Sequence, residues 1–60
     1  MTKFMALQLH KGDEVIDNDT KESIYVICSF EDVIEGKSYV MIEGIGKNQG
    51  YNHWSSDNIS

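Results

Sequence analysis

Three groups of residues in this 60-residue chain have side chains that could take part in chemistry. The first is His10, Cys28 and His53, which together offer the parts of a nucleophile–base pair or a metal site. No two of them stand at the spacing of a zinc-binding motif. Cys28 lies within an apolar segment, where a buried thiol behaves as a small inert hydrophobe. We therefore expect two surface histidines, a core thiol and no enzyme.

Two loop segments are the next candidates for ligand chemistry. Asp17-Asn18-Asp19 with Glu22 could offer oxygen ligands to a hard cation, but Lys21 stands where a calcium loop needs a further Asp or Asn. A solvated turn is the stronger interpretation, since Asp and Asn side chains bond to nearby backbone. Gly44-Ile45-Gly46-Lys47 lacks the spacing of a phosphate-binding loop. We predict no metal and no cofactor.

The aromatic residues near the end of the chain are the most interaction-like feature. Tyr51, His53 and Trp54 stand among Asn and Gln residues, a composition typical of interface hot spots. In a strand, Tyr51 and His53 share one face and Trp54 lies on the other. We expect Trp54 to fill the core and leave open whether Tyr51 and His53 bind a partner. Tyr39 could extend the exposed stripe formed by Tyr51 and His53. The candidate protein-binding residues are therefore Tyr39, Tyr51 and His53.

The charge of the chain is strongly negative and unevenly placed. The net charge is −5, and eight acidic residues but only one lysine lie between Asp13 and Glu35. Arginine is absent, although nucleic-acid binding relies on cations and favours arginine. The composition argues against a nucleic-acid partner. It predicts an acidic surface that binds a basic groove on a partner protein, and this surface could do so by imitating DNA. Solubility alone is the alternative. The acidic candidates for this surface are Asp17, Asp19, Glu31, Asp32 and Glu35.

Short apolar segments separated by turns must position these residues. Met5, Leu7 and Leu9 alternate with polar or small residues, which predicts a strand; a helix from Thr2 is the alternative. Gly12-Asp13 predicts a turn, because glycine adopts positive φ without strain. Further strands are expected over Val15–Ile16, Ser23–Phe30, Lys37–Glu43 and Tyr51–Trp54.

Alternation assigns side chains to faces within these strands. Ile24, Val26, Cys28 and Phe30 are expected on one face, with a bulge at Glu31-Asp32. Val40 and Ile42 should face opposite to Tyr39 and Met41. Glu35-Gly36 predicts a hairpin turn, and Gly44, Gly46 and Gly50 are expected in a polar loop. Ser55–Asn58 can form one 3₁₀ or helical turn that returns Ile59 to the core.

This order of elements resembles the SH3-like small barrels. The resemblance rests on Gly12-Asp13-x-Val15, on the runs Ile24–Phe30 and Tyr39–Ile42, and on Trp54 followed by Ser-Ser-Asp-Asn-Ile. It implies one all-β domain over residues 1–60, a small antiparallel barrel of four to five strands with a short terminal 3₁₀ turn. Peptide-binding SH3 domains carry paired tryptophans and a proline that this chain lacks. The similar ribosomal and elongation-factor barrels carry a basic loop where residues 17–22 are acidic.

These observations together predict a small cytoplasmic protein-binding module. An acidic, arginine-free domain of this size is typical of proteins that phages and mobile elements encode to regulate or inhibit a host protein. A lone cysteine suits a reducing compartment, and neither a signal peptide nor a membrane-spanning segment is recognisable. The alternatives are a nucleic-acid-binding barrel and a structural homo-oligomer, such as a homodimer, joined through exposed strand edges.

Overall fold

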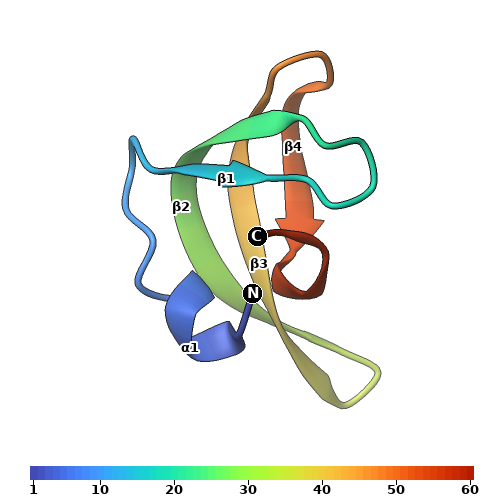
Figure 1. Cartoon of the computed structure of the whole chain (residues 1–60). Helices are drawn as coiled ribbons and strands as arrows, with labels where there is room; N and C mark the ends of the chain where they lie inside the picture. Colours follow the sequence, from blue (N-terminus) through green and yellow to red (C-terminus); the bar gives the residue numbers. More distant parts are fainter.

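The structure is a computed structural model that describes residues 1–60, and it is mostly β. Four antiparallel strands in the order β1-β2-β3-β4 curl into a half-barrel, with a short helical turn near each end of the chain (Figure 1). The predicted fold class is confirmed. The elements are α1 (Lys3–Ala6), β1 (Glu14–Ile16), β2 (Ser23–Ile34), β3 (Lys37–Gly46), β4 (Gly50–Ser55) and the 3₁₀ turn η1 (Ser56–Asn58).

Each strand pairs with its neighbour in sequence, and the longest hairpin joins β2 to β3. Its two turn residues, Glu35 and Gly36, have φ values of 52° and 79°, as a tight hairpin of the usual twist requires. The predicted turn is confirmed. The tip of this hairpin extends away from the rest of the half-barrel (Figure 1). We call residues 31–38 the distal hairpin.

The end of the chain returns to the first strand. Ser55 Oγ accepts a hydrogen bond from the Asp57 amide and caps η1, as predicted. The chain then lies beside β1, where the Ile16 amide donates to the Ser60 carbonyl and the Ser60 amide donates to the Ile16 carbonyl, both at 2.9 Å. Ile59 is fully buried, so the predicted return to the core is confirmed.

One apolar cluster fills the concave side of the sheet. Trp54 is 7% exposed and belongs to this core, as expected. Gly44 also faces inward, and a Cβ atom there would lie 2.5 Å from the Tyr25 carbonyl oxygen. The prediction that Gly44 and Gly46 lie in a loop is wrong, because both are buried residues of β3 that let β2 and Trp54 approach closely. The core consists of Ala6, Val15, Ile24, Val26, Val40, Ile42, Trp54 and Ile59.

The strand predicted over Met5–Leu9 is wrong, and the helical alternative is right. Thr2 caps α1 by accepting a hydrogen bond from the Met5 amide at 3.1 Å. Met5 and Leu7 are both more than half exposed, whereas Ala6 is fully buried. The apolar alternation over Met5–Leu9 therefore does not indicate the buried face of a strand. The helical turn α1 packs against the core through Ala6.

The predicted facing of the second half of β2 is also wrong. The pairing with β3 shifts from Val26↔Gly44 to Cys28↔Glu43, so the bulge lies at Ile27 rather than at Glu31-Asp32. One extra residue moves every later side chain to the opposite face. Phe30 leaves the core face, and Cys28 is exposed rather than a core thiol.

Candidate functional site: the outer face of the sheet

The side of the sheet away from the core carries aromatic and apolar side chains from all four strands. We call it the outer face. The strand register sets its side chains in rows, because residues paired across strands point to the same side. The exposed fractions of Tyr25, Ile45 and Tyr51 are 42%, 47% and 62%. The rows are Glu14-Tyr25-Ile45-Tyr51, then Cys28-Glu43-His53, then Phe30-Met41-Ser55.

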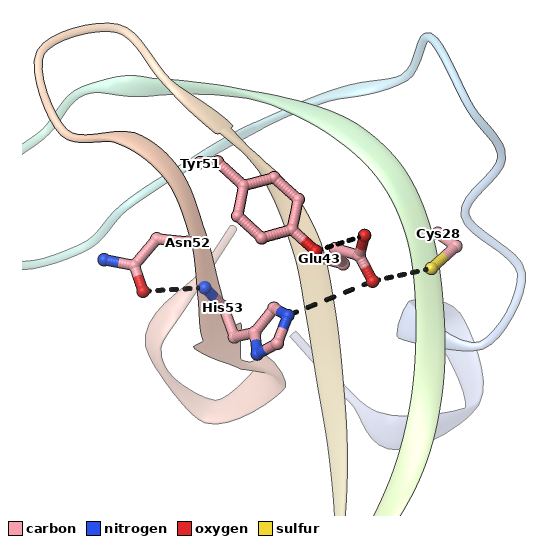
Figure 2. A network of polar contacts seen from close by, with 5 residues as sticks. All are labelled: Cys28, Glu43, Tyr51, Asn52 and His53. Carbon is pink, nitrogen blue, oxygen red and sulfur yellow. Dashed lines mark hydrogen bonds and ion pairs between the residues drawn. The ribbon is translucent and has the colours of Figure 1, made fainter.

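Glu43 lies at the centre of this face and joins three strands. Figure 2 shows its carboxylate between Cys28 of β2 and the Tyr51 and His53 side chains of β4. The Tyr51 hydroxyl donates to Oε2 at 2.6 Å, and the Cys28 thiol donates to Oε1 at 3.5 Å. His53 Nε2 lies 3.9 Å from Oε1. Glu43 thus has partners from both neighbouring strands.

Aromatic rings surround this carboxylate. The His53 ring meets the edge of Tyr51 at a centroid distance of 5.8 Å and that of Phe30 at 5.4 Å, both in T-shaped geometry. Such pairs add stability beyond the area they bury. These contacts orient the His53 ring relative to Tyr51 and Phe30 on the outer face.

The electrostatics of the face keep Glu43 ionised and Cys28 neutral. The Tyr51 hydrogen bond lowers the pKa of Glu43 against an opposing effect of burial. Burial, and then Glu43 itself, raises the pKa of the Cys28 thiol. A thiol with a raised pKa is a poor nucleophile. The Glu43 carboxylate is therefore the group in this cluster that can receive a positive charge.

No lysine neutralises Glu43. Its one ion-pair partner is His53, which carries charge only when protonated, and no lysine in the protein forms an ion pair with an acid. No three His, Cys, Asp or Glu side chains converge as metal ligands, and the surface has no pocket. None of the helices is long or apolar enough to cross a bilayer. The outer face is thus an open surface with a negative charge at its centre that no lysine compensates.

The structure divides the predicted acidic residues among different places. Glu31, Asp32 and Glu35 are exposed in the distal hairpin, with Asp32 paired across the strands to Tyr39. Asp19 is exposed in the loop 17–22, at the opposite end of the long strand β2. The acids therefore do not form one continuous face. Tyr39 continues the outer face toward the distal hairpin.

Asp17 does not belong to an exposed acidic surface, because it is only 3% exposed. Its Oδ2 accepts hydrogen bonds at 3.1 Å from both the Trp54 indole and the Gln49 side chain, and its Oδ1 accepts one at 2.9 Å from the Asp19 amide. The Asp19 amide lowers the pKa of Asp17, while burial opposes that shift. A buried indole N–H needs an acceptor, and Asp17 supplies it for Trp54.

Glu43 was not among the site residues predicted from the sequence. Its alternation with Val40 and Ile42 places it on the side of Tyr39 and Met41, so its face was predictable. Its position opposite His53 depends on the β3–β4 register, and its position opposite Cys28 depends on the bulge in β2. Only the structure brings the three together.

Comparison with protein-family models, curated proteins and solved structures found no match. The fold and the site define this protein by themselves: a small four-stranded antiparallel half-barrel with an aromatic outer face around an ionised glutamate.

Replacing Tyr51 by phenylalanine is expected to raise the pKa of Glu43. The hydroxyl that stabilises the carboxylate is removed, while the ring and its contact with His53 remain. The pKa is measured by NMR titration of the Glu43 side-chain carboxyl carbon. Tyr25→Phe, on the same face but without a bond to Glu43, is the matched control and should leave this pKa unchanged. If the pKa of Glu43 were the same in the Tyr51→Phe and Tyr25→Phe variants, the hydrogen bond from Tyr51 would not be what lowers this pKa.

Proposed function

We propose that this protein is a protein-binding module whose binding surface is the outer face. The observation that carries the proposal is Glu43, an ionised carboxylate without a lysine partner at the centre of exposed aromatic side chains. Aromatic anchors around a polar centre are the usual make-up of an interface hot spot. Tyr51 and His53, left open by the sequence, are part of this surface.

The partner offers a cationic side chain to Glu43. An arginine or lysine at this position gains an ion pair with the carboxylate and lies against the rings of Tyr51, His53 and Phe30. Glu31, Asp32 and Glu35 in the distal hairpin add negative charge at one end of the face. Such charges speed the approach of a basic partner more than they tighten the complex.

The wider predictions extend this proposal. The strand order, the turn η1 and the return of the chain onto β1 support an SH3-like barrel as the finer description of the fold. A role as a regulator or inhibitor of a host protein, encoded by a phage or mobile element and acting in the cytoplasm, rests on size and acidity alone. These points stay predictions.

A pull-down from bacterial lysate with charge-reversed variants tests the proposal. Glu43→Lys places a cation where the partner's cation binds, and recovery of the partner should fall at least about tenfold, since an unpaired interface charge costs several kcal/mol. Asp57→Lys is the matched control, because this exposed acid lies in η1, outside the outer face, and makes no side-chain bond. Circular dichroism verifies that both variants are folded.

The outcome that would overturn the proposal is recovery of every partner by Glu43→Lys at the level of the control. A triple reversal of Glu31, Asp32 and Glu35 to lysine tests the role of the distal hairpin. We expect slower association and a weaker salt dependence, with Glu43 still required. Binding of duplex or single-stranded DNA at low salt would instead favour the nucleic-acid alternative.

A further inference from the structure

The two edges of the sheet differ in how they are covered. Along β1, the outer edge is paired with the end of the chain through bonds between Ile16 and Ser60 and between the Asn18 amide and the Asn58 carbonyl. Strand β4 pairs with β3 on one side, and no strand of the sheet pairs with its second side. The six residues of β4 therefore form an open edge, as do residues 28–34 of β2, which pair only with β3 and carry Glu31 and Asp32.

The register shows which backbone groups this edge presents. The Lys47 amide donates to the Ser23 carbonyl, so odd-numbered residues in this part of β3 bond to β2 and even-numbered ones bond to β4. Asn52 and Trp54 pair with even-numbered residues of β3, so their backbone groups are occupied. The backbone groups of Tyr51, His53 and Ser55 face outward, away from the sheet.

The side chain of Asn52 occupies the centre of this edge. Its Oδ1 accepts a hydrogen bond from the His53 amide at 2.9 Å (Figure 2). A carboxamide is chemically the same group as a peptide bond. Asn52 Oδ1 thus stands where the carbonyl oxygen of an added strand would lie, and the exposed side chain can turn away when such a strand arrives.

The edge formed by β4, unlike that of β2, also lacks charge. Strands β1, β2 and β3 each carry ionised side chains, whereas β4 has the sequence Gly-Tyr-Asn-His-Trp-Ser. Exposed edges are usually protected by lysine, proline or inward-pointing charges. In a protein of net charge −5, this is the strand along which a second copy can approach without placing like charges against each other.

We propose that β4 pairs antiparallel with β4 of a second copy about a two-fold axis, which joins the two sheets into one. The outward backbone groups of Tyr51, His53 and Ser55 then bond to the same groups of the other copy, and the interface is self-complementary, as in most homodimers. The outer faces of the two copies become continuous, with one Glu43 cluster on each side of the axis. This inference does not depend on the proposed function.

Sedimentation equilibrium over about 10 µM to about 1 mM tests the proposal, since small interfaces associate in this range. The wild-type protein should pass from the 6.8-kDa monomer toward twice that mass. Asn52→Ala frees the His53 amide in the monomer, so the dimer should be about tenfold tighter. Asn52→Lys places two cations near the axis and should weaken the dimer about tenfold or more.

His53→Pro removes the outward amide and no bond of the β3–β4 ladder. It should be monomeric, while its control His53→Ala, which keeps the amide, should associate like the wild type. Circular dichroism reports whether the proline variant is folded. If it is not, the dimer affinities of the two Asn52 variants test the pairing of β4 with β4. A wild-type protein and an Asn52→Ala variant that both stay monomeric at the highest concentration would overturn the proposal, as would a folded His53→Pro variant that dimerises normally.

Discussion

Gly44→Ala is expected to be the most destabilising small substitution in this protein. The new methyl group would lie 2.5 Å from the Tyr25 carbonyl oxygen and 2.9 Å from Ile24 Cγ2. The oxygen belongs to the backbone of β2, which cannot move away without disturbing the hairpin formed by β2 and β3. We expect a loss of about 3 kcal/mol in the free energy of unfolding. A domain this small has few kcal/mol to lose, so a large fraction of the variant would be unfolded.

Urea denaturation followed by Trp54 fluorescence measures this loss. Gly36→Ala is the matched control, because a Cβ atom at Gly36 meets nothing within 4 Å and only the φ of 79° opposes it. Its cost should be about 1 kcal/mol. If the Gly44→Ala variant were no less stable than the Gly36→Ala variant, this would contradict the close approach of β3 to β2 at Gly44.

Asp17→Asn should lower the thermal unfolding midpoint on the order of 10 °C at pH 7. The carboxylate accepts hydrogen bonds from Trp54, Gln49 and the Asp19 amide, all of which are donors. An amide of the same size offers one acceptor oxygen and turns its own N–H groups toward one set of these donors. The volume is unchanged, so the loss reports the hydrogen bonds rather than the packing.

The pH dependence separates this effect from a general weakening. The pKa of Asp17 is lower in the folded state than its ordinary value of 3.8, so its stabilising contribution is complete above that value and is lost as the pH falls below it. The difference between the wild type and Asp17→Asn should therefore shrink in acid. Asp57→Asn, an exposed acid without a side-chain bond, should match the wild type throughout. A pH-independent difference would contradict the hydrogen-bond explanation.

Much of the fold follows from local patterns in the sequence. The β-branched run of β2, the Glu35-Gly36 turn and the serine cap before η1 each depend on neighbouring residues, and each was predictable. The facing of Tyr51, His53 and Trp54 followed from alternation within one short strand. Local rules therefore predicted the four strands that the structure contains and the facing of side chains within β4.

The remaining features depend on contacts between distant residues. An apolar run gives no sign of where a bulge falls, so the shift at Ile27 that turns Cys28 and Phe30 outward could not be predicted. Gly44 resembles a loop residue until β2 lies against it. Asp17 resembles a surface acid until Trp54, 37 residues away, points its indole at it. The Glu43 cluster depends on two strand registers, that of β2 with β3 and that of β3 with β4, and neither can be read from one segment of the sequence.

The return of the chain onto β1 has a consequence for folding kinetics. Strands β2, β3 and β4 are joined by short turns, so their pairing closes small loops at low entropic cost. The contact between Ile16 and Ser60 instead brings together residues that are far apart in the sequence. We expect the central hairpins to form in the folding transition state and the β1–Ser60 pairing to form after it. Substitutions of Ile59 should then speed unfolding while leaving the folding rate almost unchanged.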